Sequence, residues 1–254
     1  MTRLTRIVVY PIKSLDGVSV ESSNVLASGA LSLDRRYALV DSEGRYINGK
    51  RFAAIHHIRS RFDIAQQRVH LSHTTAGPAE FRLPDESGEL SNWVTGALGV
   101  ACRLIENMAQ GFPDDTEAVG PTLISTATLR AFAGWFDGLS LDEARLRFRA
   151  NLEVDAPAAY WEDRLVAAGG FRLGESRWNA TGVCQRCVVP SRQPQTAESI
   201  PRFAKRFSEL REQTLPDWSP RDRFDHFYRL AVNTRLAPGC VATELQVGDA
   251  LSFD

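Results

Sequence analysis

The chain has few cysteines, histidines and methionines, and no long hydrophobic run. Of its 254 residues, four are Cys, five are His and two are Met. Four cysteines in a chain of this length do not make a disulfide scaffold, which favours a reducing compartment. No apolar run approaches the roughly 18 to 20 residues of a membrane-spanning helix. The apolar stretch near Met1 is too short for a secretory signal. We therefore expect a cytoplasmic protein with no membrane partner.

The sequence also lacks an excess of charge of either sign. Its 30 Lys and Arg oppose 31 Asp and Glu, for a net charge of −1 and a pI of about 6.5. This balance provides no overall positive field for nucleic acid or for an anionic membrane surface. The length suffices for one or two domains with sizeable cores. We expect a globular protein that does not bind nucleic acid.

Short segments with strand-like alternation dominate the first third of the chain. The predicted strands there are residues 7–10, 37–40, 45–47, 61–65, 68–72 and 79–83. The run Asp41-Ser42-Glu43-Gly44 is a turn signal, so the second and third of these form a predicted hairpin. A helix is expected over residues 91–98, capped by Ser91 or Asn92, with Gly99 beyond its end.

Residues 110–121 concentrate Gly, Pro and acidic residues, which is typical of a domain boundary. We therefore divide the chain into residues 1–112 and 113–254. After the boundary, Ser125 is placed to cap a helix through Leu129 and Phe136, and residues 201–213 form a second predicted helix. Residues 227–232 and 250–253 are predicted strands. Many short strands and few helices indicate a mainly β fold, with a β-barrel-like domain and peripheral helices.

The run Cys184-Gln185-Arg186-Cys187 holds two of the four cysteines and places a guanidinium beside a thiol. A neighbouring positive charge favours the thiolate, the form of cysteine that soft metals bind, so we expect Arg186 to help keep Cys187 deprotonated. A structural zinc ion needs four ligands, and this run offers half of them. A thioredoxin-like redox pair and two buried structural cysteines in a strand are further alternatives.

Basic residues recur at other points of the chain. Lys13 and Ser14 directly follow a strand that Pro11 terminates, and this pair suits a phosphate group. Arg35 enters the next predicted strand, and Arg149 lies on the same face of an extended segment as Asn151. Each signal alone is weak, because most arginines are simply solvated.

Taken together and in this order, these segments resemble one family. The chain is similar to MOSC-domain proteins with an N-terminal MOSC β-barrel domain, of the kind found in amidoxime-reducing and N-hydroxylated-base-reducing molybdoenzymes. The matching segments are residues 10–14, 34–41, 123–129, 148–152, 184–187 and 247–249. The resemblance implies a MOSC N-terminal β-rich domain over residues 1–112 and a MOSC β-barrel domain over residues 113–254.

The same resemblance implies a molybdenum–molybdopterin cofactor, with Cys187 as metal ligand and catalytic residue. The implied cofactor contacts are Lys13, Ser14, Arg35, Ser125, Arg149, Asn151, Gln185 and Arg186. The implied activity is reduction of N-hydroxylated compounds such as hydroxylamines and amidoximes. Because the chain ends at Asp254 with no appended iron–sulfur domain, we expect a separate electron donor of ferredoxin, flavin or cytochrome type. The alternative is a sulfur-carrying MOSC protein with a cysteine persulfide, loaded by a partner.

Two segments depart from the family pattern. After the cysteine run the family often has Asp-Pro-Asp-Thr-Gly, whereas this chain has Gln193-Pro194-Gln195-Thr196-Ala197. Both carboxylates are therefore missing. Residues 118–121 also lack the hydroxyl groups that some relatives use on the cofactor, which leaves Ser125 as the expected substitute.

Overall fold

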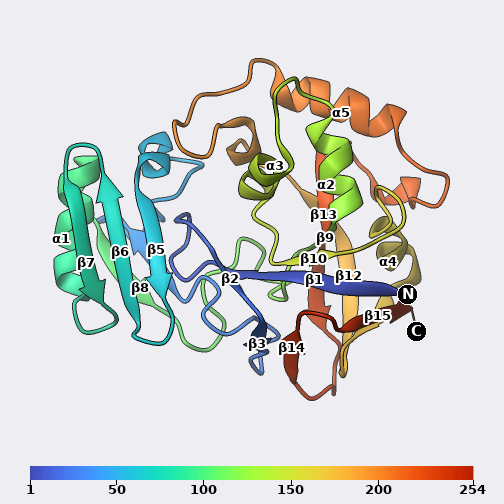
Figure 1. Ribbon diagram of the computed structural model, residues 1–254, viewed down its shortest axis with the longest axis horizontal. Coiled ribbons are helices and arrows are strands. Elements are labelled where there is room, and N and C mark those ends of the chain that lie inside the picture. The colour runs from blue at the N-terminus through green and yellow to red at the C-terminus, as the bar shows by residue number, and fades with distance from the viewer. Residues whose placement is uncertain (254) are drawn as a thin grey trace.

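The computed structural model describes residues 1–253, which form a mainly β molecule with two groups of strands. Figure 1 shows the groups side by side, one at each end of the long axis. A closed barrel carries both chain termini, and smaller sheets with one helix form the other end. The expectation of a mainly β fold with a barrel and peripheral helices is confirmed. Within residues 1–253 no helix is both long enough and apolar enough to cross a membrane.

The barrel consists of seven strands. In order around it they are β10 (Leu152–Val154), β9 (Leu123–Ser125), β13 (Arg229–Leu236), β12 (Ser176–Gln185), β11 (Gly170–Leu173), β15 (Ala250–Phe253) and β1 (Thr2–Val9). Pairing of β1 with β10 closes the ring, which leaves no unpaired edge in it. All neighbours are antiparallel except β9 and β10. The short β2 (Val18–Val20) pairs with β1 outside the ring.

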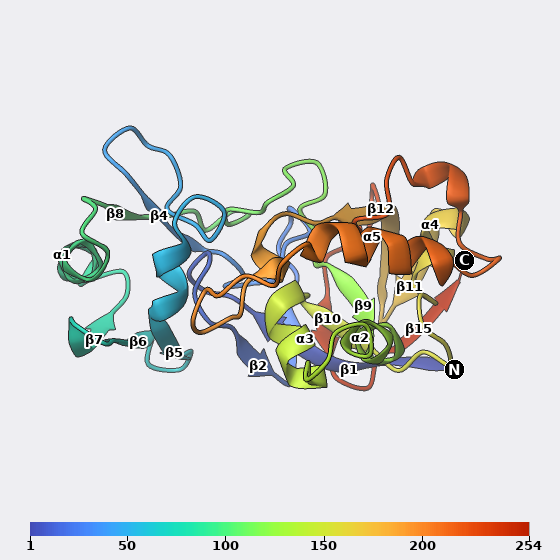
Figure 2. The same cartoon turned by 90° about the horizontal axis from the view of Figure 1, so that it is seen from above.

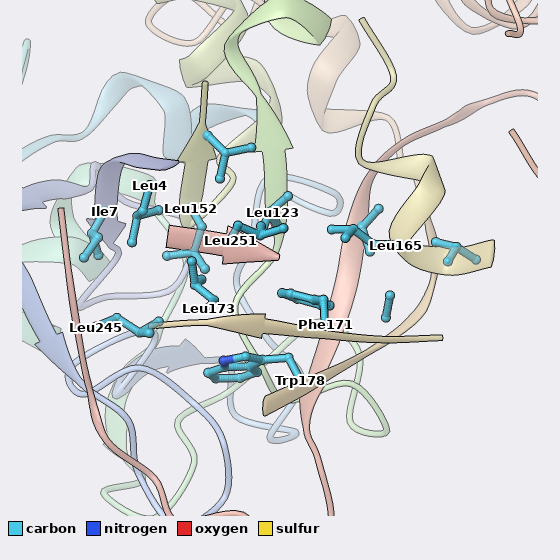
Figure 3. Packing of buried hydrophobic residues seen from close by; sticks show 14 of the residues in the cluster. Leu4, Ile7, Leu123, Leu152, Leu165, Phe171, Leu173, Trp178, Leu245 and Leu251 are labelled. Carbon is cyan, nitrogen blue, oxygen red and sulfur yellow. The ribbon is translucent and has the colours of Figure 1, made fainter. Parts of the chain in front are cut away.

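The barrel interior is filled by apolar side chains from strands far apart in the sequence. Figure 3 shows Leu4 and Ile7 of β1 with Leu123, Leu152 and residues of later strands in one cluster. The barrel thus combines strands from both sides of the boundary predicted at residues 112 and 113. As a boundary between independently folding units, that division stays a prediction.

The other end of the molecule has its own core. Strands β5 (Arg59–Asp63), β6 (Arg68–His73) and β7 (Gly77–Arg82) form an antiparallel sheet, and β4 (Tyr37–Val40) pairs with β8 (Arg103–Glu106). Helix α1 (Ser87–Leu98) covers them with Leu90 and Val94. The predicted start of this helix at residue 91 is wrong, since α1 begins at Ser87. Its first turn contains Leu90 as the single apolar residue, so the apolar residues there show no helical spacing.

Helices α2 (Thr126–Ala133), α3 (Leu141–Phe148), α4 (Asp163–Ala168) and α5 (Phe203–Gln213) surround the barrel (Figure 2). Phe132, Phe148, Phe203 and Phe207 form an aromatic cluster between three of them. The remaining elements are β3 (Ser22–Asn24), β14 (Glu244–Gln246), and the 3₁₀ turns η1 (Ala53–His57), η2 (Val189–Ser191) and η3 (Arg221–Arg223).

Candidate functional site

A cavity of about 700 Å³ lies between the barrel and the N-terminal sheets, with residues of both lining it. Its size falls within the usual range for small-molecule sites, about 300–1,000 Å³. Eight of the nine site residues predicted from the sequence line it: Lys13, Ser14, Arg35, Arg149, Asn151, Gln185, Arg186 and Cys187. Folding therefore brings four separate segments to one place.

Three of these residues have an unusual backbone conformation. Ser14, Arg35 and Arg149 all have positive φ, at 74°, 49° and 52°. Such a conformation costs a non-glycine residue about 1–3 kcal/mol and is found preferentially at functional sites. In Arg149 it also ends helix α3, whose C-cap this residue forms. The backbone at the cavity is thus shaped to aim these side chains, at some cost in stability.

Lys13 is a buried cation with a carboxylate partner. Its Nζ donates to the Phe112 carbonyl oxygen and to Asp114 Oδ1, both at 2.8 Å. Burial lowers the pKa of Lys13, and Asp114 counteracts that effect. Burial of the Asp114 carboxyl group acts to raise its pKa. The positive charges of Lys13 and Arg35 outweigh that effect and hold the pKa well below its usual range. Lys50 Nζ lies 3.7 Å from the same carboxylate.

Two arginines that line the cavity pack against one aromatic ring. The Arg35 and Arg149 guanidinium carbons lie 5.2 and 4.1 Å from the centre of the Tyr10 ring. Arg35 also pairs with Asp34, while Arg149 donates to the Leu15 carbonyl oxygen at 2.7 Å. Burial lowers the pKa of Arg149. Packing on Tyr10 therefore fixes two like charges close together, where an anion between them would be stabilised.

Asn151 is a structural member of this wall. Its Oδ1 accepts from the Thr122 backbone N–H at 3.2 Å and from Arg35 at 3.4 Å. Its Nδ2 donates to the Val8 carbonyl oxygen at 3.0 Å. The side chain, 2% exposed, thus ties β1 to the start of β9 and positions Arg35.

The two cysteines of the run differ in their surroundings. Cys184 lies near the end of β12, and Arg186 donates to its sulfur over 3.1 Å and to the Phe148 carbonyl oxygen over 2.9 Å. The guanidinium thus turns back to Cys184 and the strand, and the expected effect of Arg186 on the Cys187 thiolate stays a prediction. Within residues 1–253 the Cys187 thiol has no hydrogen-bond partner, although Tyr228 donates to its carbonyl oxygen at 2.8 Å.

Ser125 does not reach the cavity. Its hydroxyl is fully buried at the N-terminus of α2, where it accepts from the Thr128 backbone N–H at 3.1 Å and donates to Thr128 Oγ1 at 2.9 Å. The interpretation of Ser125 as a cofactor contact is thus wrong, whereas its predicted role as a helix cap is confirmed. Gln185 does line the cavity, and its side chain is exposed.

Some lining residues were not singled out from the sequence. Asp114 stands in the acidic run that the sequence indicates as a domain boundary, and no motif in the sequence points to His56. The structure places both at the cavity, together with Asp34 and Lys50. The only sequence signal for Asp114 is the density of Asp and Glu after Pro113, which is equally typical of a linker.

The donor set of the cavity suits an anionic ligand. Seven Lys and Arg and five Asp and Glu line it, an excess of two positive charges. Arg186 Nε and His56 Nε2 are buried atoms of lining residues with no hydrogen-bond partner within residues 1–253. An unsatisfied buried donor costs about 1–3 kcal/mol of stability. A ligand with an acceptor atom at Arg186 Nε would remove that cost and so be bound more tightly. These features fit a phosphate-bearing cofactor.

Comparison with protein families agrees with this architecture. Residues 1–106 match the MOSC N-terminal beta barrel domain and residues 122–252 match the MOSC domain. The chain belongs to the MOSC-domain family. The N-terminal match in this MOSC protein covers β1 and β2 as well as the sheets that pack with α1.

The relatives found by sequence are all named molybdenum cofactor sulfurase. The protein from Drosophila grimshawi is 25% identical over 240 residues, which cover 79% of this chain and 30% of the relative. The one from Oryza sativa subsp. japonica is 25% identical, with 73% and 28% covered. The MOSC protein thus spans about a third of the length of these relatives. A solution structure from Bordetella bronchiseptica overlaps with 30% of the chain at 17% identity and a TM-score of 0.26, too little to support an argument.

Proposed function

We propose that this MOSC protein binds an anionic pterin cofactor of the molybdopterin class in its cavity and carries sulfur on Cys187 beside it. The observation that supports this most directly is the isolation of one thiol in a cation-lined cavity. Cys187 has no hydrogen-bond partner within residues 1–253, whereas Cys184 is engaged by Arg186. The sulfurase names of the relatives point in the same direction.

The residues suited to hold the cofactor divide by chemistry. Lys13, Ser14 and Arg35 lie together where phosphate oxygens would find an ammonium, a hydroxyl and a guanidinium. Arg149 and Arg186 add donors on the barrel side. When bound, the cofactor supplies a soft metal that accepts sulfur ligands.

The sulfur-carrying step uses Cys187 as a nucleophile. Its thiolate attacks the outer sulfur of a donor persulfide, a new S–S bond forms on Cys187, and the S–S bond of the donor breaks. The donor leaves as a thiolate, so no net oxidation or reduction occurs. A partner has to supply the persulfide. Since the Cys187 sulfur has no hydrogen-bond partner within residues 1–253, it is free to meet that donor.

A persulfide-loading experiment tests this function. The protein is incubated with a low-molecular-weight persulfide, and intact and peptide masses are recorded. We expect a gain of one sulfur atom on Cys187, reversed by a reducing thiol. Cys187→Ser should abolish the gain, and the matched variant Cys184→Ser should retain it. Equal loading of wild type and Cys187→Ser would contradict the proposal.

The second candidate is a molybdenum-dependent reductase of N-hydroxylated compounds, with Cys187 as metal ligand. The observation in its favour is that eight residues implied by the resemblance to that family lie in one cavity. Electrons would come from a separate partner protein. The test is benzamidoxime reduction by cofactor-loaded protein with a chemical reductant. Turnover that disappears in Cys187→Ser would favour this candidate, and its absence in loaded wild type would exclude it.

A further inference from the structure

The cations suited to a phosphate already hold a carboxylate of the chain itself. Asp114 Oδ1 lies 2.8 Å from Lys13 Nζ and 3.7 Å from Lys50 Nζ. The charge of Arg35 also lowers the pKa of this carboxyl group. Lys13 and Lys50 therefore hold one internal anion, which the charge of Arg35 also stabilises. This anion lies where Lys13, Ser14 and Arg35 line the cavity.

The two members of this ion pair are unequally free. The Lys13 side chain is 6% exposed and is also anchored to the Phe112 carbonyl oxygen, whereas the Asp114 side chain is 58% exposed. The Lys13 ammonium stays fixed inside the protein by its hydrogen bond to the Phe112 carbonyl oxygen, whereas the exposed carboxylate of Asp114 can turn outward into water, where it is well solvated. Asp114 is thus the member that is able to give way.

The surrounding turn does not depend on Asp114. Its neighbour Asp115 accepts from the Glu117 backbone N–H at 3.0 Å and the Ala118 N–H at 3.2 Å, and also binds Asn233 at 3.2 Å. Those bonds hold the segment to the barrel. Within residues 1–253, the Asp114 side chain pairs with Lys13 and Lys50 alone. Rotation of Asp114 therefore leaves the turn intact.

We infer that Asp114 is a specificity-determining residue of the anion site, whose carboxylate occupies Lys13 until a phosphate dianion displaces it. This inference rests on the anion site of the proposed function. A carboxylate on the same chain has a high effective concentration, so a free monoanion of the same chemistry gains little by replacing it. A phosphate carries about −1.5 to −2 charges at neutral pH and has three acceptor oxygens. It can bind Lys13, Ser14 and Arg35 at once, which the single Asp114 carboxylate does not.

The consequence is selection by charge. Discrimination arises when a site penalises the wrong ligand as well as rewarding the right one. Asp114 penalises carboxylates and other weak monoanions, because each must compete with a tethered equivalent. Without the Asp114 charge, the cation cluster would accept both classes of anion more readily, and the preference for phosphate would shrink.

The test measures binding of inorganic phosphate and of acetate by isothermal titration at low ionic strength. The proteins are wild type, Asp114→Asn, Asp114→Glu and Glu117→Gln. Asn keeps an oxygen acceptor for Lys13 while losing the charge, and Glu restores the charge. Glu117→Gln removes one charge from the same segment. Glu117 is an exposed residue of the cavity lining that forms no ion pair within residues 1–253. Circular dichroism checks that each variant is folded.

We expect Asp114→Asn to bind phosphate on the order of tenfold more tightly and acetate by a larger factor. Glu117→Gln and Asp114→Glu should stay within about threefold of wild type. If wild type and Asp114→Asn bind phosphate equally, the inference is overturned while the anion site stands. If Glu117→Gln has the same effect as Asp114→Asn, net charge alone is responsible and the inference also fails. If neither protein binds phosphate, the anion site and the inference fail together, whereas persulfide loading of Cys187 tests the sulfur chemistry separately.

Discussion

Two clusters of charged side chains in this protein have opposite designs. At the cavity, Lys13 is buried but its partner Asp114 is largely exposed. Behind helix α5, Arg211 and Asp163 form an ion pair whose side chains are 0% and 2% exposed. Ser219 also donates to that Asp163 carboxylate, at 2.5 Å. The first cluster is open to solvent on one side, and the second is closed on all sides.

The closed cluster is built into the packing of the helices. The Arg211 guanidinium carbon lies 4.0 Å from the centre of the Tyr160 ring and 5.2 Å from that of Phe224. No incoming ligand can replace Asp163 there without unfolding. We interpret the closed pair as structural, because loss of either partner would leave an unpaired buried charge, and the open pair as one that a ligand is able to exchange. Four predictions test this distinction.

The largest effect is expected in the closed cluster. Asp163→Asn leaves the Arg211 charge buried without a counter-ion, which should lower the free energy of unfolding by about 3–5 kcal/mol. Urea denaturation followed by circular dichroism measures it. The control is Glu209→Gln on helix α5, which also carries Arg211; it removes a surface pair with Lys205 at 3.8 Å and should cost under about 0.5 kcal/mol. Similar losses in both variants would remove the distinction between enclosed and exposed pairs.

Glu162, next to Asp163, should make the stability of the closed cluster depend on pH. Burial, and then the charge of Asp163, raise the pKa of Glu162 from 4.5 to about 7. A raised pKa means that the folded state holds the proton more tightly than the unfolded chain. This stabilisation is complete below pH 4.5 and is lost as the pH rises through about 7.

Glu162→Gln removes that titration. Relative to wild type, the variant should gain on the order of 3 kcal/mol of unfolding free energy between pH 4.5 and pH 8. Urea midpoints at several pH values provide the measurement. Parallel pH profiles for the two proteins would show that Glu162 has the same pKa in the folded and unfolded states, and the cluster would then be less closed than the structure indicates.

An intermediate effect is expected at Ser125, which lies beside the closed cluster through Thr128. Because Thr128 donates to Glu162 at 3.0 Å and Ser125 caps α2, Ser125→Ala should cost about 1 kcal/mol of stability. Phosphate affinity should be unchanged. A loss of phosphate binding with unchanged stability would restore Ser125 as a cofactor contact.

The smallest effect on stability is expected in the open cluster. Lys13→Met removes a buried charge whose partner is able to turn to water, so the unfolding free energy should change by less than about 1 kcal/mol. Titration of the same variant should show at least about tenfold weaker phosphate binding. If Lys13→Met instead unfolds as readily as Asp163→Asn, the open cluster is structural and the comparison fails.

Local patterns in the sequence predicted much of the fold. The strand over residues 37–40 has the predicted bounds, and β6 and β7 match to within two residues, because alternation of polar and apolar side chains is a local property. Strand β12 was missed although Trp178 and Ala180 alternate with polar neighbours, because Gly182 and a shift of the β13 register there interrupt the alternation. Its pairing on both sides, with β11 and β13, compensates for this weak local signal.

For the candidate site, too, the sequence predicted some features and missed others. Composition, the motif set and the ordering of its segments identified the family and most of the residues that line the cavity, while the role of Cys187 as the working thiol stays a prediction. Side-chain direction and partner choice depend on which segments the fold packs together, as with residues 13 and 114, and no local pattern encodes that packing. Only the tertiary structure therefore decided that Arg186 turns to Cys184, that Ser125 lies away from the cavity, and that Asp114 occupies Lys13.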